Sequence, residues 1–125
     1  MIERLFSSPN YDAAKRLLDV SVLRHEALAS NIANLETPGY RRVDLPKDFQ
    51  TAFNQALRSG KPKTVTVSGL IQDNDSPAQR KDGNNVLLQD ELMSMNKNAA
   101  EYEALSEFVT GTMKTLHMAI AGRSQ

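Results

Sequence analysis

The sequence predicts an elongated all-α protein in which two long helices, one near each end of the chain, pack side by side as a coiled coil. Apolar residues recur at alternating steps of three and four in residues 9–36 and again in 88–120, the spacing of a coiled-coil seam. Between them lies an irregular middle segment. We therefore divide the chain into an N-terminal helix with its stop (1–40), a loop-rich connection (41–85) and a C-terminal helix (86–125).

The first long helix is predicted over residues 9–36. Ser8 is a suitable N-cap, and Pro9 fits the first turn of a helix, where a missing N–H costs nothing. Its apolar stripe includes two polar positions and consists of Ala14, Leu18, Ser21, His25, Leu28, Ile32 and Leu35. This stripe predicts one buried face along the whole helix.

The stretch SNIANLETPGYRR combines two amide side chains with an abrupt helix stop. Asn31 and Asn34 lie on one helical face, where a buried amide fixes the register of a coiled coil and can also bind free carbonyls at a helix end. Pro38-Gly39 fits the centre of a type II turn, which requires a positive φ at Gly39. We expect Tyr40 to pack on a helix with its hydroxyl at a polar edge, and both asparagines to bond to backbone or side chains of adjacent helices rather than to a ligand.

The middle segment, residues 41–85, differs in composition from the ends. DLPKDFQTAFNQALRSG is predicted to form a short helix, with Phe49, Phe53 and Leu57 at steps of four and Gly60 just past its end. The stretch KTVTV has strand character. Residues 68–85 are rich in Asp, Asn, Ser, Gly and Pro and are interpreted as loop.

The C-terminal segment has the clearest periodicity in the chain. The predicted helix seam consists of Leu88, Leu92, Met95, Ala99, Tyr102, Ser106, Val109, Met113, Leu116 and Ile120. From Leu88 to Ile120 a helix spans roughly 50 Å, whereas a compact globule of this size is only about 35 Å across. The seam is therefore too long for one partner helix, and we expect other chains to bury it in an assembly.

Composition narrows the classes of function without choosing one. The 125 residues balance 15 basic against 15 acidic side chains, so no overall field directs the chain to nucleic acid or anionic lipid. Residues 1–63 carry ten basic and seven acidic side chains, and residues 64–125 carry five and eight, so the two halves have net charges of +3 and −3. There is no cysteine, and no apolar run is long enough to span a membrane.

The sequence contains no convincing catalytic, metal or cofactor motif, and we expect none of these sites. His25 and His117 fall on separate helices, whereas a metal site needs three or four convergent ligands. Asp73 in DNDS is better explained by turn chemistry than by a calcium loop. Asp90-Glu91 is interpreted as complementing the dipole at a helix start.

Two stretches resemble a known family, the axial proteins of the bacterial flagellar rod and hook. LASNIANLETPGYRRVDL is similar to the signature in which an N-terminal helix ends in N-I-A-N-x-x-T-P-G-Y. KDGNNVLLQDELMSMNKNAAEYEAL resembles the turn and C-terminal helix of the short rod proteins of that family. The resemblance covers about 80 residues at the two ends, and the middle matches poorly. Leu35-Glu36 and Leu87 depart from the usual pattern.

The resemblance implies a non-catalytic structural subunit of the proximal rod in the flagellar basal body. It also implies export through the flagellar type III apparatus without a cleaved signal peptide, and assembly in the rod that spans the periplasm. The implied partners are other rod subunits, the rod–ring adaptor FliE and the export gate, with no nucleic acid. The implied interface residues are Asn31, Asn34, Thr37, Pro38, Gly39 and Tyr40.

Two points stay open at this stage. The apolar cluster Ile2, Leu5 and Phe6 is interpreted either as a docking element for the export gate or as a staple for the first helix. An export chaperone or adaptor with a helical-hairpin fold, or another short rod protein of the same family, would also fit the helical pattern. A chaperone would be a stably folded monomer or dimer, which sedimentation distinguishes from an assembly-dependent subunit.

Overall fold

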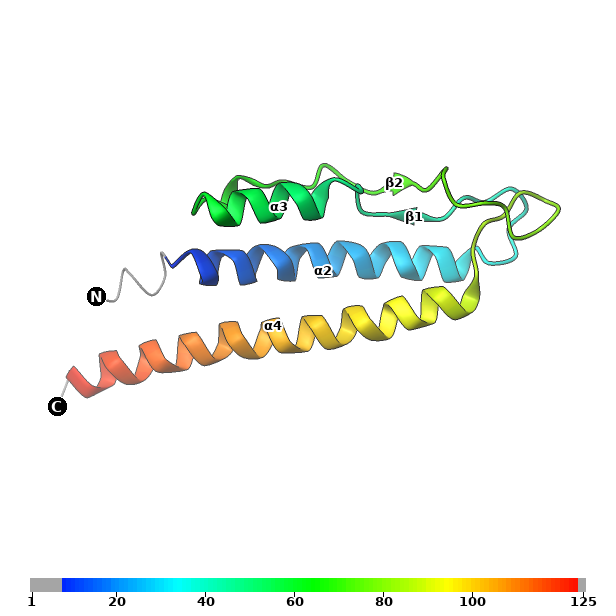
Figure 1. Cartoon of the computed structure of the whole chain (residues 1–125). Helices are drawn as coiled ribbons and strands as arrows, with labels where there is room; N and C mark the ends of the chain where they lie inside the picture. Colours follow the sequence, from blue (N-terminus) through cyan, green and yellow to red (C-terminus); the bar gives the residue numbers. More distant parts are fainter. Residues whose placement is uncertain (1–7, 124–125) are drawn as a thin grey trace.

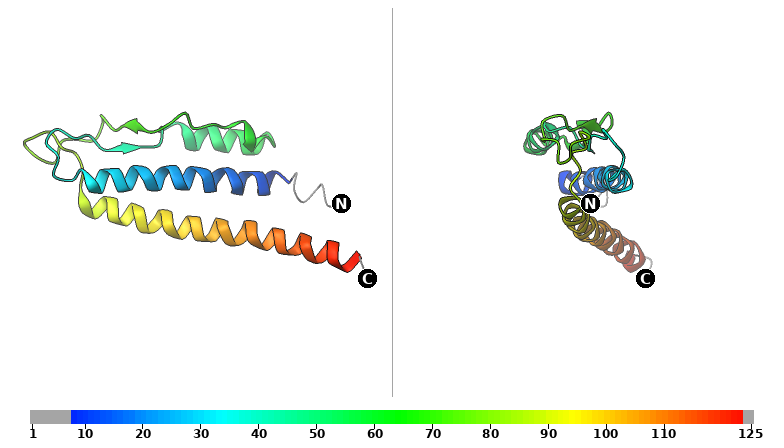
Figure 2. Two further views of the ribbon diagram at one scale, coloured as in Figure 1. Left: turned by 180° about the vertical axis from the view of Figure 1, so that it is seen from behind. Right: turned by 90° about the vertical axis from the view of Figure 1, so that its right-hand side faces the viewer.

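A computed structural model describes residues 8–123 and shows an elongated, mostly helical chain (Figure 1). Helix α2 (Pro9–Ala33) and helix α4 (Leu88–Arg123) lie side by side in opposite directions, and the connecting segment returns along the far side of α2 (Figure 2). The molecule thus has three layers, with α2 in the middle. This confirms the predicted all-α architecture with two long terminal helices.

Helix α2 begins as its sequence predicts and ends earlier. The backbone N–H of Tyr11 donates to Ser8 Oγ (3.2 Å), which caps the helix, and Pro9 occupies the first turn. The helix stops at Ala33, with Asn34 as C-cap, so residues 34–36 form a turn instead of the predicted last helical residues. The side-chain amide of Asn34 donates to the Ser30 carbonyl (2.9 Å), so a residue of the last turn supplies a hydrogen bond to a carbonyl of that turn.

The connecting segment holds the short helix α3 (Phe49–Arg58) and a 3-10 turn, η1 (Pro62–Thr64). Helix α3 ends in a Schellman motif, in which the N–H of Lys61 donates to the Ala56 carbonyl (2.8 Å) and Gly60 has a φ of 73°. Leu57 is 37% exposed, because the face of α3 that packs on α2 contains Phe49, Phe53 and Ala56.

The only sheet in the described part of the chain is a two-stranded one. Strand β1 (Val43–Asp44) pairs antiparallel with β2 (Ile71–Gln72), so that Val43 lies opposite Gln72. The predicted strand KTVTV is wrong in position. Residues 62–64 form the 3-10 turn, and Val65 and Val67 use their apolar side chains to cover the core under α3 without joining a ladder.

The hydrophobic core lies between α2 and α3. Phe49 and Phe53 stack with their ring centroids 5.8 Å apart and pack on Ala13 and Val20 of α2. The contacts between α2 and α4 are more polar, and they include a hydrogen bond from Asn98 to the backbone carbonyl of Ser21 (2.9 Å). The chain therefore has one small apolar core and one long, partly polar helix pair.

We expect Phe53→Ala to lower the free energy of unfolding by about 3–5 kcal/mol, because the ring is 3% exposed and its loss leaves a cavity. The neighbouring exposed side chain gives a matched control, Leu57→Ala, for which we expect a change of about 0.5 kcal/mol or less. Urea unfolding followed by circular dichroism measures both. Equal losses for the two variants would show that α3 is not packed on α2 as described.

Candidate functional site

The candidate site is the junction where α2 ends, the chain turns through Thr37–Tyr40, and α4 begins. The turn has the predicted geometry. The N–H of Tyr40 donates to the Thr37 carbonyl (3.3 Å), and Gly39 has a φ of 71°. The hydroxyl of Tyr40 donates to Asn31 Oδ1 (3.1 Å) and lies 3.1 Å from Ser30 Oγ. The turn is thus fastened back onto the last turn of α2.

Asn31 is the central side chain of the junction and is completely buried. Its amide oxygen accepts from the N–H of Val43 (2.8 Å), and its amide nitrogen donates to the carbonyl of the same residue (2.9 Å). The side chain therefore pairs with β1 as another strand would. The same nitrogen also donates to Glu91 Oε2 (3.0 Å) at the start of α4. One amide joins α2, β1 and α4.

Asn34 has a more local role than Asn31. Besides capping α2, it accepts a hydrogen bond from Thr37 Oγ1 (3.1 Å) through its side-chain oxygen. The expectation that both side chains bond to adjacent helices is met by Asn31, which reaches Glu91 of α4, and not by Asn34, whose side chain bonds to its own helix and to the following turn. Their role in contacts with other subunits stays a prediction.

A second pair of asparagines, which the sequence analysis placed in a loop without a role, completes the junction. Asn84 is fully buried, and its amide nitrogen lies within 2.9–3.1 Å of the carbonyls of Asn34, Leu35 and Thr37. These carbonyls lie in the turn that follows α2, and two of them also accept backbone N–H groups, Asn34 from Thr37 (3.1 Å) and Thr37 from Tyr40 (3.3 Å). Asn85 accepts from the N–H of Arg42 (2.7 Å) and donates to the Asp73 carbonyl (2.9 Å).

Two glycine turns meet at this point. A Cβ on Gly83, whose φ is 89°, would lie 3.8 Å from the Cα of Gly39. The signal for this contact was the stretch KDGNN, in which Asp-Gly marks a tight turn and the two amides follow directly. No local pattern in either stretch pairs KDGNN with TPGY, because the two turns are far apart in the chain.

An ion cluster covers the other side of the junction. Arg42 donates to Glu91 (2.8 Å), Asp73 (3.1 Å) and Asp44 (3.1 Å), and Glu91 is only 2% exposed. Burial by itself opposes the charge on Arg42, but hydrogen bonding and attraction to Glu91 outweigh it and raise the pKa of Arg42. Glu91 lies in the first turn of α4, as the helix-dipole interpretation expects, and it is also a buried ion-pair partner of Arg42.

Asp73 organises the loop that approaches this cluster. It accepts from Ser76 Oγ (2.7 Å) and from the backbone N–H groups of Asp75 (3.2 Å) and Ser76 (3.1 Å). These bonds, led by the Ser76 hydroxyl and joined by the Arg42 guanidinium, hold the pKa of Asp73 far below its usual range. The turn interpretation of DNDS is confirmed, and residues 8–123 contain no cluster of side chains that could hold a metal ion.

The predicted helix seam is only partly covered within one chain. Leu116 is buried at 5% exposure, whereas five seam residues are 39–49% exposed, namely Leu88, Leu92, Tyr102, Met113 and Ile120. Met95 and Val109 are half-buried. Helix α4 meets α2 through Glu91 and Asn98, so the seam begins on one flank of α4. Its burial in an assembly stays a prediction.

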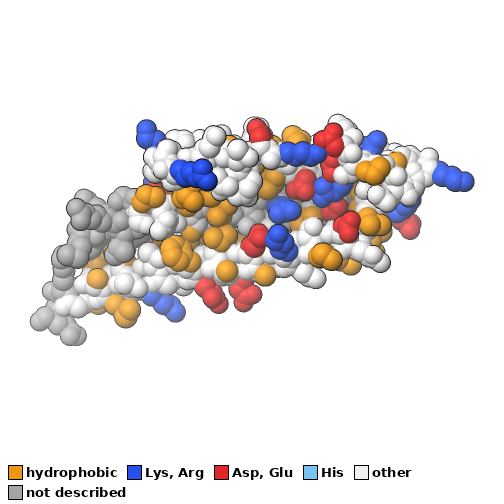
Figure 3. All heavy atoms as spheres, in the orientation of Figure 1, with side chains coloured by type: hydrophobic (Ala, Val, Ile, Leu, Met, Phe, Trp, Pro, Cys, Tyr) orange, Lys and Arg blue, Asp and Glu red, His pale blue; other side chains and the backbone are white. Residues whose placement is uncertain are grey.

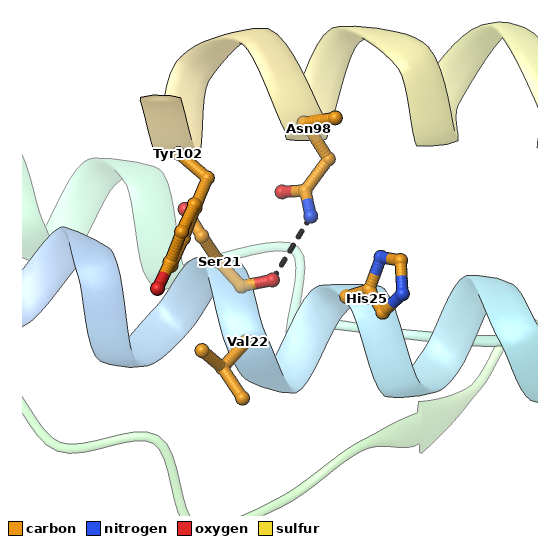
Figure 4. A pocket seen from close by; sticks show the side chains of 6 residues that line it. Ser21, Val22, His25, Asn98 and Tyr102 are labelled. Atoms are coloured by element: carbon orange, nitrogen blue, oxygen red, sulfur yellow. Dashed lines mark hydrogen bonds between the residues drawn. The ribbon is translucent and has the colours of Figure 1, made fainter. Parts of the chain in front are cut away.

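A groove of 290 Å³ lies beside the seam, between α2 and α4. It is lined by Ser21, Val22, His25, Asn98, Ala99 and Tyr102 (Figure 4). The amide of Asn98 is already used by the Ser21 carbonyl. His25 lies at the exposed rim, far along α2 from the turn at Thr37–Tyr40. Most of the lining is apolar, which suits contact with another apolar side chain.

Together the fold and the junction define an elongated helical building block whose long helix presents more apolar surface than its own chain covers. No protein-family model matches the chain. It is 30% identical to the flagellar basal body rod protein FlgB of Aquifex aeolicus (strain VF5), over 89% of this chain and 92% of that protein. It is 32% identical to FlgB of Aeromonas hydrophila (84% and 87%) and 30% identical to FlgB of Escherichia coli (strain K12) (84% and 94%). The chain belongs to the FlgB family of flagellar basal body rod proteins.

Two further findings complete the comparison with expectation. None of the helices in residues 8–123 has the length and hydropathy that crossing a membrane requires. The apolar cluster Ile2, Leu5 and Phe6 lies outside the described residues.

We expect Asn31→Ala to lower the free energy of unfolding by about 1–3 kcal/mol for each buried group that loses its partner, since Glu91 and the Val43 backbone both depend on this amide. Asn54→Ala, at an exposed amide of α3, is the matched control and should change it by about 0.5 kcal/mol or less. Urea titration gives both values. If Asn31→Ala were as mild as the control, the junction would not depend on this side chain.

The lowered pKa of Asp73 predicts an acid-sensitive contribution to stability. Because the unfolded chain takes up the proton near pH 3.9 and the folded chain only at lower pH, the contribution is complete above about pH 4 and decreases as the pH falls below it. We expect Asp73→Asn to be less stable than the parent at pH 6 and to lose less stability between pH 5 and about pH 2.5. Asp75→Asn, at a carboxyl that is 78% exposed, is the control. Parallel pH profiles for Asp73→Asn and the parent would contradict this assignment.

Proposed function

We propose that the chain is a structural subunit of the proximal rod of the flagellar basal body and acts by assembling with other axial proteins, without catalysis. The observation that carries this proposal is its similarity to FlgB proteins over 84–89% of its length, which is too long to lie within either half of the chain. The fold supports it, because α4, at 36 residues, is about 54 Å long and α2, at 25 residues, is about 38 Å, so that α4 extends beyond its partner.

The exposed surface of α4 supports an assembling role. Large apolar side chains are exposed on several sides of this helix, among them Leu92, Phe108 and Met118 at 45%, 48% and 67%. A helix that is apolar on several sides is stable when neighbours surround it. Helices of adjacent rod subunits would supply those neighbours through coiled-coil contacts, and the groove beside Tyr102 would accept one of their side chains.

The junction would set the direction in which the connecting segment leaves the axial helices. In this proposal residues 1–40 and 86–125 are the axial segments, and residues 41–85 are held against α2 by the amides and the ion cluster. A joint with a single conformation matters in a repeating assembly, because an error in direction would recur in each subunit. Asn31, Asn34, Thr37, Pro38, Gly39 and Tyr40 are thus the proposed residues of the joint.

The finer assignments belong to the same proposal. Neighbours would be other rod subunits, the rod–ring adaptor FliE and the export gate of the flagellar type III apparatus, through which the chain would be exported to the periplasm. A docking role for Ile2, Leu5 and Phe6 at that gate stays a prediction. Residues 1–63 and 64–125 have opposite net charges, +3 and −3, which favours contacts between subunits over contacts with nucleic acid.

The rod assignment is tested by deleting the gene and by isolating basal bodies from cells that express a tagged, full-length chain. The proposal requires that the deletion abolish motility and that the tagged chain be found in the rod fraction. Normal motility of the deletion strain, together with absence of the chain from basal bodies, would refute it.

The joint gives a sharper prediction. We expect Gly39→Val to abolish rod formation and motility while secretion continues, because a β-branched residue at a φ of 71° costs about 1–3 kcal/mol and redirects the chain. Asn34→Leu, which removes the C-cap, should act in the same direction. Gly69→Val is the control: its φ of 146° is also unusual, but it lies outside the joint and leaves room for a side chain. Normal motility of both joint variants would show that TPGY only ends the helix and does not direct assembly.

A further inference from the structure

Helix α4 has an unpartnered face that points away from α2. Asn98 faces α2, and Glu107 lies nine positions further on, which is about two and a half helical turns, so Glu107 points to the opposite side. Glu103 precedes Glu107 by one turn and shares its face. Phe108, next to this pair, is 48% exposed. Within residues 8–123 neither glutamate has an ion-pair partner.

The opposite edge of the molecule carries the complementary features. Arg58 ends α3, and Lys61 and Lys63 flank the proline of η1, all three with exposed side chains. Leu57, beside Arg58, is 37% exposed. This edge is thus basic with one exposed leucine. The face of α4 carries Glu103 and Glu107, with Lys114 two turns beyond Glu107 on the same side and Phe108 about 100° round the helix from Glu107.

The two edges lie at the same level along the molecule. Among the hydrogen bonds that join α2 and α4, two bracket these edges, Tyr11 to Met113 (3.6 Å) and Asn98 to Ser21 (2.9 Å). Glu103 and Glu107 lie between the levels of these two bonds on α4. On α2, Asp12 and Arg16 lie between the same levels, and both bind Lys63 of η1, at 3.2 Å and 3.0 Å. Figure 3 shows acidic side chains on the lower edge, over α4, with a basic side chain beside them, and both basic and acidic side chains along the upper edge.

We propose that a second copy of this chain docks side by side and in the same orientation, with the basic edge at Arg58 and Lys61 on the acidic face at Glu103 and Glu107. Leu57 of one copy then packs against Phe108 of the next. The proposal deepens the proposed function, on which it rests, by naming a lateral contact between copies. We choose a second copy as the partner because the basic edge and the glutamates lie at the same height along the long axis of the molecule and have opposite charges.

The arrangement is heterologous: each copy uses one edge to bind and offers the other edge to the next copy. A two-fold contact of α4 with α4 is disfavoured, because it brings the glutamates of two copies together. Successive copies therefore form a lateral series, which is the geometry that a cylindrical wall requires.

Cross-linking tests this contact cleanly, because the chain has no cysteine of its own. The full-length chain carrying Leu57→Cys and Phe108→Cys is oxidised both as purified protein and in isolated basal bodies. We expect a ladder of dimers, trimers and larger species. Either single variant should give no ladder. The control pair, Leu57→Cys with Val22→Cys, joins the basic edge to an exposed residue of the groove and should give none either.

Charge reversal is a second test of the same contact. Glu103→Lys with Glu107→Lys should lower the yield of cross-linked ladder about tenfold, and adding Arg58→Glu with Lys61→Glu should restore it. Circular dichroism of each variant checks that its helix content is unchanged. Loss without restoration would overturn the proposed pairing.

The outcomes separate this contact from the rod assignment. A ladder from the purified chain, with no chain in basal bodies, would refute the rod function and retain the contact. A chain present in basal bodies that gives no ladder there or in solution would overturn the contact and leave the rod function intact.

Discussion

The structure depends on one buried amide. Asn31 pairs with both backbone groups of Val43 and at the same time donates to Glu91, so the position of β1 and the start of α4 are both set by a side chain of α2. A buried polar group is costly without partners and directional when all its bonds are made. Arg42 extends the constraint, because its guanidinium neutralises Glu91 and reaches Asp44 in β1 and Asp73 just after β2. A buried ion pair contributes little net stability, because the desolvation of both charges offsets their attraction, whereas removing one partner leaves the other charge buried and unpaired.

The long helices obey a different constraint. A heptad repeat drifts by about 20° per heptad on a straight helix. Because Glu91 and Asn98 turn one face of α4 toward α2, the seam starts on a flank at Leu88 and Leu92 and comes to be buried only at Leu116. One partner helix cannot follow this path. The polar junction therefore sets the rotation of α4 about its axis, and this rotation leaves most of the apolar seam uncovered. The uncovered seam is the surface that neighbouring helices can bury.

The chain combines a small apolar core, between α2 and α3, with a more polar contact between α2 and α4. Phe49 and Phe53 attach the connection to α2 without help from α4. The contacts between α2 and α4 include instead buried amides such as Asn98, which donates to the Ser21 carbonyl. A protein built to meet several copies and several partners benefits from a surface that is apolar in stripes and charged at its two edges.

The sequence by itself determined the helices, their caps, the type II turn and the family. These features are local: Ser8 needs only the next turn of α2, Gly39 only its own φ, and Gly60 only the end of α3. The position of the second strand was not predictable from the sequence. KTVTV has side chains typical of a strand, but the segment that pairs with β1 depends on where β1 lies, and Asn31 holds β1 in place. Only the tertiary structure showed that Asn84, Asn85 and Glu91 complete the junction, since residues some 50 positions apart meet there through hydrogen bonds that leave no periodic pattern in the sequence.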